Sequence, residues 1–250
     1  MSLSLKKEKA MSRVVLYHSG MSNGYFICEK DAVIAVDGGA VYGKEEVEKN
    51  LKENAIDPKK IRLIIASHAH VDHTCNLGIL RELSGAPILV AKAGAEDMEK
   101  AEMPHVFPRN QIGDEIMEFA KRQGGMPDDY LPPIKADITF EEEFDLSSYG
   151  VKGKIIYTPG HSLSDSCVIL DSGEAILGDL MVEDDFTHGK PTIAYFGYDP
   201  DRKKANELLL KGLDKIAETK ARIFYSGHGG PFTRKQFDDA LAEAKEQAGK

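Results

Sequence analysis

The sequence predicts an α/β fold, a four-layer αβ/βα sandwich made of two related halves. The first observation is that short β-rich runs and helical patterns occur twice in the same order along the 250 residues. The second is local similarity between the halves, since IRLIIASHAH resembles ARIFYSGHGG and AVIAVDGG resembles EAILGDL. The third is that polar residues follow the predicted strands in both halves, with Asp37 and Asp179 at matching places. Two β-rich halves with helices on their outer sides stack as four layers.

In the first half, β-rich runs between turn residues predict short strands, and longer amphipathic patterns predict helices. The predicted strands are Val14–His18, Tyr25–Glu29, Ala32–Asp37 and Ile61–Ala66, and the predicted helices are Lys44–Asn54, 74–83 and 92–101. The run at Ile61–Ala66 is continuously apolar, which is typical of a strand that is buried on both faces. Residues 1–10 are expected to form a flexible leader.

The second half repeats this order. Its predicted strands are Gly153–Thr158, Cys167–Asp171, Ala175–Gly178 and Arg222–Tyr225, and its predicted helices are Asp201–Glu218 and 233–247. The last helix has apolar residues at helical spacing, at Phe237, Leu241 and Ala244. We therefore expect one domain over residues 11–250.

Between the halves, residues 102–133 are interpreted as a helical insertion. Five prolines punctuate one predicted helix at Gln111–Gln123. The apolar residues of this segment are Met103, Phe107, Ile112, Ile116, Met117, Phe119, Met126 and Tyr130. They fit an apolar lid over a site, and they equally fit ordinary packing.

Composition and charge exclude several classes of protein. The 42% hydrophobic and 29% charged residues are ordinary for a globular protein, and a net charge of −9 argues against a nucleic-acid partner. No apolar stretch is long enough for a membrane span, and no secretory segment is recognisable, so a cytoplasmic location is expected. The cysteines Cys28, Cys75 and Cys167 lie in apolar runs, as reduced core thiols do. A homodimer is compatible with these observations.

The strongest local signal is SHAHVDH, which directly follows the predicted strand at Ile61–Ala66. It places three imidazoles and a carboxylate within a few positions, and these groups together suit zinc. His68 and His70 can face a first ion from an extended turn. Asp72 and His73, which open the next helix, can face a second. A capping role for these polar residues is the alternative, and the density of ligand-type side chains disfavours it.

Three further residues occupy the same position relative to predicted strands. His161 follows a Pro-Gly turn in TPGHS, Asp179 follows a strand in LGDL, and His228 follows a strand in SGHGGP. Each alone fits a capping or hydrogen-bonding role. Together they supply the additional donors that a site for two metal ions needs.

The motifs His68-Ala69-His70-Val71-Asp72-His73, Thr158-Pro159-Gly160-His161, Gly178-Asp179 and Gly227-His228 resemble those of the metallo-β-lactamase superfamily, and the resemblance spans nearly the whole chain outside the insertion. It implies that His68, His70 and His161 hold one ion and that Asp72, His73 and His228 hold the other. It also implies that Asp179 bridges both. The expected cofactors are two divalent metal ions, with zinc favoured over iron or manganese.

The details of the motifs favour one branch of that superfamily. An aspartate at position 179 resembles the glyoxalase II and lactonase branches, whereas true β-lactamases usually lack this carboxylate and are exported. The oxygen-reducing diiron branch typically has glutamate where this chain keeps His70. A glyoxalase II would continue into a helical substrate domain, and only a short helix is predicted after His228.

The expected function is hydrolysis of a small ester, thioester or lactone by a metal-bridging hydroxide. Asp72 would orient this nucleophile and take up its proton. Asp37 is expected either to orient a ligating imidazole or to form a turn before Gly38 and Gly39. A phosphodiesterase or nuclease, and iron-dependent oxidation of a thiol or persulfide, are the alternative activities. A non-enzymatic metal-binding or interaction module is disfavoured, because structural zinc sites are closed, whereas seven ligands for two ions leave open positions.

Overall fold

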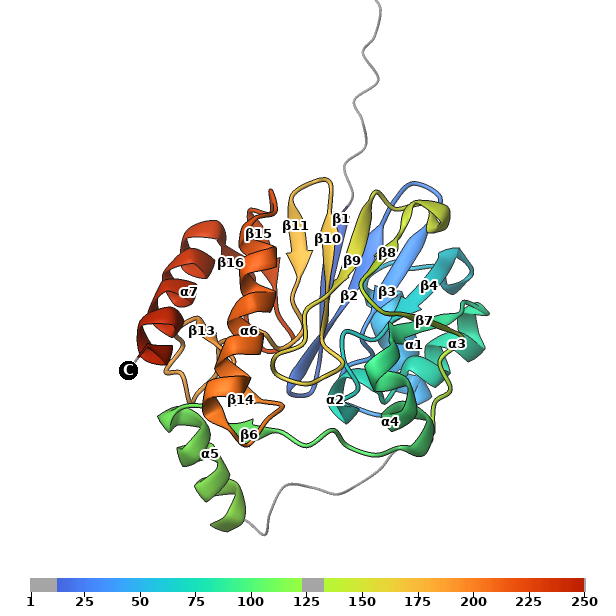
Figure 1. Ribbon diagram of the computed structural model, residues 1–250. Helices are drawn as coiled ribbons and strands as arrows, with labels where there is room; N and C mark the ends of the chain where they lie inside the picture. The colour runs from blue at the N-terminus through green and yellow to red at the C-terminus, as the bar shows by residue number, and fades with distance from the viewer. Residues whose placement is uncertain (1–12, 123–132, 250) are drawn as a thin grey trace, which may run out of the picture.

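Two six-stranded sheets face each other in this computed structural model, which describes residues 13–122 and 133–249 (Figure 1). The first sheet has the order β1 (Arg13–Ser19), β2 (Ser22–Cys28), β3 (Val33–Val36), β4 (Ile61–Ile65), β5 (Ile88–Ala91), β7 (Ile138–Phe140). The second has the order β16 (Phe232–Thr233), β15 (Ile223–Tyr225), β11 (Glu174–Ile176), β10 (Ser166–Leu170), β9 (Gly153–Tyr157), β8 (Glu143–Asp145).

Helices and two short ribbons complete the fold. The α-helices are α1 (Lys44–Glu53), α2 (Val71–Thr74), α3 (Leu77–Ser84), α4 (Ala95–Lys100), α5 (Gln111–Arg122), α6 (Arg202–Ala217) and α7 (Arg234–Ala248). Short 3-10 turns lie at Pro58–Lys60, Lys92–Gly94 and Ser147–Tyr149. The ribbons pair β12 (Met181–Val182) with β13 (Thr192–Ile193) and β6 (Phe107–Pro108) with β14 (Phe196–Gly197).

The strand pairing confirms that the two halves are related. In the first half, β1, β2 and β3 pair antiparallel in turn, and β4 then pairs parallel to β3. In the second half, β9, β10 and β11 repeat the antiparallel pairing, and β15 pairs parallel to β11. Asp37 follows β3 and Asp179 follows β11, so the similarity of the two sequence segments corresponds to equivalent places in the fold.

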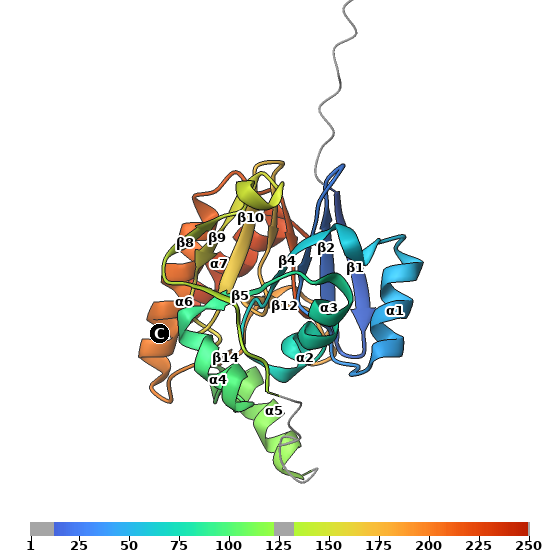
Figure 2. The ribbon, with the colours of Figure 1, turned by 90° about the vertical axis from the view of Figure 1, so that its right-hand side faces the viewer.

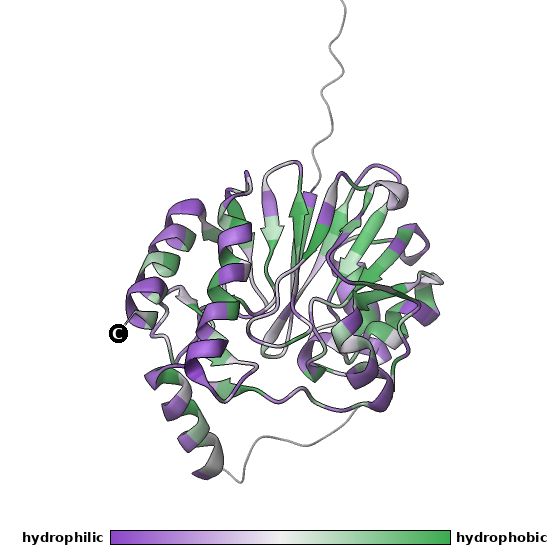
Figure 3. Cartoon of the chain, viewed as in Figure 1, coloured by the Kyte–Doolittle hydropathy of each residue, from purple (hydrophilic) through white to green (hydrophobic). Residues whose placement is uncertain are grey.

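Alternating burial along the strands produces the four predicted layers. On β3, Val33 and Ala35 face the core under the helices of the first half, whereas Ile34 and Val36 face the core between the sheets. On β10, Cys167 joins the core under α6 and α7. Figure 2 shows α1 and α3 on one outer face and α6 and α7 on the other, and Figure 3 shows apolar strands between helices with polar outer faces.

Most predicted elements are present with shifts of one to three residues at their ends, and three differences are informative. The predicted helix at 74–83 is two helices, α2 and α3. The predicted helix at 92–101 is a 3-10 turn followed by α4. The sequence analysis missed β5, a fully buried strand that pairs parallel to β4. An apolar run of only four residues carries no periodicity that distinguishes a strand from a helix.

Parts of the predicted organisation lie outside the described residues. These are the leader at residues 1–10 and residues 123–132 of the insertion, with Met126 and Tyr130. Within residues 102–122, β6 pairs with β14 and α5 follows it. Among the helices of the described ranges, none combines the length and the apolar character that crossing a membrane requires.

We expect Phe237→Ala to destabilise the second half by about 3–5 kcal/mol, because it deletes a buried ring. Phe237 and Phe224 are both 0% exposed, and their rings stack at a centroid distance of 4.4 Å, which joins α7 to β15. Urea unfolding followed by circular dichroism measures the loss. Ile223→Ala is the control, because Ile223 on the same strand is 41% exposed. Equal losses in the two variants would contradict this account of the core.

Candidate metal centre

The seven ligand-type residues come from loops and a helix start at the ends of β4, β9, β11 and β15. His68 and His70 lie in the turn after β4, and His70 is the residue that precedes the first turn of α2. Asp72 and His73 lie in that first turn. The extended turn therefore directs His68 and His70 toward one group of ligand-type residues, and the helix directs Asp72 and His73 toward a second group. His161, Asp179 and His228 follow β9, β11 and β15.

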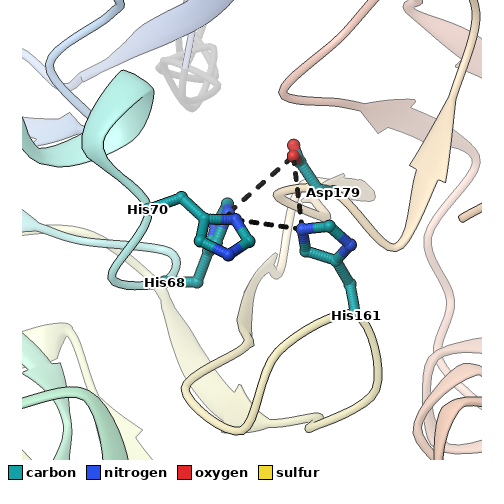
Figure 4. Close-up of side chains that lie close together, drawn as sticks. All are labelled: His68, His70, His161 and Asp179. Carbon is teal, nitrogen blue, oxygen red and sulfur yellow. Dashed lines mark hydrogen bonds and ion pairs between the residues drawn. The ribbon is translucent and has the colours of Figure 1, made fainter. Parts of the chain in front are cut away.

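The structure brings four of these residues into a first group, which is His68, His70, His161 and Asp179. His70 Nδ1 lies 2.9 Å from His68 Nε2 and 3.0 Å from His161 Nε2. Asp179 Oδ2 lies 3.8 Å from the Nε2 atoms of both His68 and His161. The three rings and the carboxylate point toward one another in Figure 4.

Asp72, His73 and His228 form the second group. Asp72 Oδ2 lies 3.3 Å from His73 Nε2 and 3.3 Å from His228 Nε2. Asp179 belongs to this group as well, because its Oδ1 is 3.3 Å from His73 Nε2 and its Oδ2 is 3.1 Å from His228 Nε2. The Asp179 carboxylate therefore lies between the two groups.

The donor atoms fit divalent metal ions. A tetrahedral ion with bonds of about 2.0–2.1 Å needs donors about 3.3 Å apart, and the separations in both groups bracket that value. His73 Nε2 and Asp179 Oδ1 are buried and have no hydrogen-bond partner among the residues that the structure describes. Buried polar atoms of this kind are normally satisfied, so a ligand at this position explains both.

The electrostatics of the side chains also favour a bound cation. Burial lowers the pKa of His68 well below its usual range and the pKa of His161 to about 3. Burial opposes protonation of His73 and His228, but neighbouring carboxylates, Asp179 above all, raise the pKa of His73 well above its usual range and that of His228 to about 10. The carboxylates thus hold positive charge at the site.

Asp37 contacts a histidine of the second group directly and a histidine of the first group through Ser67. Its Oδ2 is 3.0 Å from His73 Nδ1 and accepts a hydrogen bond of 2.8 Å from Ser67 Oγ. Ser67 Oγ is in turn 2.9 Å from His68 Nδ1. The backbone at Asp37 has φ 61°, a left-handed conformation that Asp tolerates before Gly38 and Gly39. Asp37 therefore combines the turn and the imidazole contact that the sequence analysis treated as alternatives.

Sequence reasoning missed three other atoms that fix the rings. Ser67 Oγ links Asp37 to His68, as described above. The carbonyl oxygen of Met21, at the β1–β2 turn, is 2.8 Å from His228 Nδ1. The carbonyl oxygen of Pro104, in the predicted insertion, is 3.3 Å from His70 Nε2. Such contacts select the tautomer that presents the other ring nitrogen to the centre.

Among the described residues, the centre is exposed to solvent at Asp72 and His228, which we call its open side. The side chains of Asp72 and His228 are 18% and 21% exposed, whereas those of His68 and His73 are fully buried. Solvent can therefore reach the centre past these two residues.

We expect Gly227→Ala to disrupt the centre, because its Cβ would lie 2.0 Å from Asp179 Oδ1 and 2.5 Å from His73 Cε1. Overpacking of this kind costs about 1–3 kcal/mol, and here it also displaces two candidate ligands. Thermal unfolding in the presence of a chelator measures the loss. Gly78→Ala is the matched control, because nothing lies within 4 Å of its added Cβ on helix α3. A Gly227→Ala protein as stable as the Gly78→Ala protein would refute the crowding.

Comparison with known proteins gives a consistent result. The sequence profile of the Metallo-beta-lactamase superfamily matches residues 19–228. The chain is 24% identical over 251 residues to the probable metallo-hydrolase YflN of Bacillus subtilis, covering 89% of this chain and 86% of that protein.

Two solved structures share the fold. One is the metallo-beta-lactamase family protein TTHA1429 of Thermus thermophilus, with a TM-score of 0.66 and 19% identity, covering 94% of this chain and 80% of that one. The other is TTHA1623 in a di-iron-bound form, with a TM-score of 0.63 and 18% identity, covering 91% and 98%. From the profile match and the shared fold, we conclude that this chain belongs to the metallo-β-lactamase superfamily.

Proposed function

We propose that the chain is a binuclear metal-dependent hydrolase that acts on a small ester, thioester or lactone. The observation that carries the proposal is the position of the Asp179 carboxylate, within 3.1–3.8 Å of imidazole nitrogens from both groups. His68, His70 and His161 are the proposed ligands of one ion, and Asp72, His73 and His228 those of the other. Asp179 is the proposed bridge.

Two bound divalent ions would lower the pKa of a shared water toward neutrality and polarise the carbonyl oxygen of the substrate. The residues of this chain supply the other requirements. The imidazole rings of His73 and His228 donate to Asp37 Oδ2 and Met21 O, and His68 contacts Ser67 Oγ, so the rings are held in place before the substrate arrives. The open side at Asp72 and His228 admits the substrate.

Asp72 is the proposed catalytic carboxylate. Its Oδ2 contacts His73 and His228, and its side chain reaches the open side of the centre. There it can orient the attacking water and accept its proton. His73 and His228 lower the pKa of Asp72 well below its usual range despite its burial, so Asp72 is ionised at neutral pH.

The finer assignments rest on the chemistry of the donors. Aspartate at position 179 supports the glyoxalase II and lactonase-like branch. The mixture of imidazole and carboxylate donors supports zinc, and it also accommodates iron or manganese. The three cysteines are free thiols, two of them buried, which supports a cytoplasmic location.

We expect the purified protein to bind two metal ions per chain. His161→Ala and His228→Ala should each lower the content to about one, since each removes a ligand from one group only. Elemental analysis after exchange against Zn²⁺, Mn²⁺ or Fe²⁺ measures the content and separates the possible metals. His18→Ala is the control, because His18 is an exposed residue of β1 outside both groups. Unchanged metal content in both site variants would contradict the ligand assignment.

Asp72→Asn should lower kcat/KM by about 10²-fold or more, which is the usual contribution of a general base. The assay uses a panel of 4-nitrophenyl acetate, an acetyl thioester, a lactone and bis(4-nitrophenyl) phosphate. Circular dichroism checks that the variant is folded, and Asp31→Asn, an exposed position, is the control. Full turnover by Asp72→Asn would refute its catalytic role, and hydrolysis of the phosphodiester alone would refute the substrate class.

Metal uptake should release protons, because carboxylates raise the pKa of His73 and of His228 in the metal-free centre. Both imidazoles are then protonated at pH 7 and must lose a proton to bind an ion. Metal affinity should therefore rise as pH rises from about 6 toward 9. Calorimetry in buffers with different ionisation enthalpies counts the protons. Zero release at pH 7 would show that His73 and His228 are not ligands.

A further inference from the structure

The segment Ile193–Tyr198 runs beside the proposed metal centre. Ala194 N donates a hydrogen bond of 3.1 Å to Leu180 O, next to Asp179. Four residues later, Tyr198 N donates to Gly160 O at 3.3 Å, next to His161. The backbone at Tyr195 is therefore anchored between the neighbours of two candidate ligands.

The Tyr195 hydroxyl reaches the loop that supports a third candidate ligand. It donates a hydrogen bond of 2.6 Å to Asp184 Oδ2. The residue before Asp184, Glu183, donates its N–H to His228 O at 3.0 Å. The Tyr195 side chain thus links the segment anchored beside Asp179 and His161 to the loop whose backbone contacts His228.

Protonation keeps the hydroxyl in this arrangement. Burial first, and then the hydrogen bond to Asp184, raise the pKa of Tyr195 well above its usual range, with a smaller effect from Asp179. Asp184 Oδ1 also accepts a hydrogen bond of 2.9 Å from Thr187 N, so the carboxylate is held from two sides. The Tyr195 hydroxyl therefore donates its one hydrogen bond to Asp184, and its oxygen can still accept a hydrogen bond from another group.

Arg109 anchors the same segment from the predicted insertion. Its side chain is 5% exposed and donates to three neutral oxygens, namely Ala194 O, Ile193 O at 3.1 Å and Asn206 Oδ1 at 2.8 Å. Its backbone N–H donates to Tyr195 O at 3.0 Å. One residue thus binds three successive carbonyl groups of the segment that carries Tyr195.

The residues around Arg109 reinforce this anchor. Directly before it, β6 pairs with β14, which follows Tyr195. Four residues after it, Gly113 of α5 packs so closely that an added Cβ would lie 2.4 Å from Tyr195 O. Burial of a guanidinium whose three acceptors here are all neutral is unfavourable. Its hydrogen bonds hold the backbone of the segment Ile193–Tyr198 in place.

We propose that Tyr195 binds the substrate of the metal centre, and that Arg109 is the positioning residue that holds it there. This inference rests on the proposed function. Because the phenol oxygen accepts and Asp184 is anionic, the pair fits a neutral substrate with an N–H or O–H donor near the scissile bond. The preferred substrate is therefore an ester, thioester or lactone with an amide or hydroxyl group on its acyl side.

Two esters that differ in one group test this preference. In 4-nitrophenyl N-acetylglycinate the acyl chain contains an amide N–H, and in 4-nitrophenyl 4-oxopentanoate a CH₂ replaces it. The ratio of their kcat/KM values, compared between proteins, cancels their intrinsic reactivities. Tyr195→Phe should lower this ratio about 3- to 10-fold, the factor for one hydrogen bond, and should leave metal content unchanged. An unchanged ratio would overturn the role of Tyr195.

A double-mutant cycle with Tyr195 tests the role of Arg109. Arg109→Met should lower the same ratio of kcat/KM values. Arg109→Lys keeps one donor group and should lower the ratio less. The lysine variant replaces the methionine variant if the latter does not fold. Because Arg109 acts through Tyr195, the double variant with Tyr195→Phe should show no further loss. Additive losses would show that Arg109 does not act through Tyr195. Lys203→Met is the control, because Lys203 is an exposed residue near the start of α6.

The position of residue 195 is testable without catalysis, because the chain contains no tryptophan. In Tyr195→Trp, one equivalent of Cu²⁺ should quench the single indole, whereas Zn²⁺, a d¹⁰ ion, should not. Tyr149→Trp is the control, because residue 149 lies at the other end of the strands from the metal centre. Its neighbour Gly150 packs against Ala32, which precedes β3, whereas Asp37, which follows β3, contacts His73. If wild-type protein hydrolyses neither ester, the proposed substrate class fails. Quenching then still supports the location of Tyr195, and unquenched emission at position 195 overturns the inference.

Discussion

The buried carboxylate of Asp179 is the constraint on which the arrangement of this protein depends. It lies between imidazoles from the two related halves of the sandwich, and burial of such a charge without compensation would be strongly unfavourable. The histidines raised in pKa beside it balance the charge in the metal-free protein, and divalent ions would balance it in the proposed holoenzyme. The strand ends of both halves bring those side chains to one place.

The repeated strand order explains how that convergence is achieved. In each half a parallel pair of strands ends at the same edge of its sheet, so loops of unrelated sequence position deliver their polar residues together. The apolar layers hold the bases of those loops rigid, because the strand residues alternate between two well-packed cores. Asp37, at the place in the first half that matches Asp179, ties His73 and His68 to the same network. Because Gly227 has no Cβ, the loop that carries His228 can approach Asp179 closely.

The layers and the candidate ligands could be predicted from the sequence, because both depend on the types of residue at particular positions. Strand ends followed by His and Asp are visible in a single chain, and so is the duplication of AVIAVDGG and IRLIIASHAH. Contacts made by backbone carbonyls are not visible, because Met21 O and Pro104 O would be present whatever the side chain. The contact between Arg109 and Ala194 was also hidden, since 85 residues separate them. The short strand β5 was missed because four apolar residues carry too little pattern.

The central claim is that two ions bind on either side of Asp179, and anomalous diffraction from crystals grown with Zn²⁺ tests it most directly. The account predicts two anomalous peaks about 3.5–4 Å apart, one within bonding distance of His68, His70 and His161 and the other within bonding distance of Asp72, His73 and His228. Asp179 should contact both. A single peak away from Asp179, or a well-ordered centre without any anomalous peak, would contradict it.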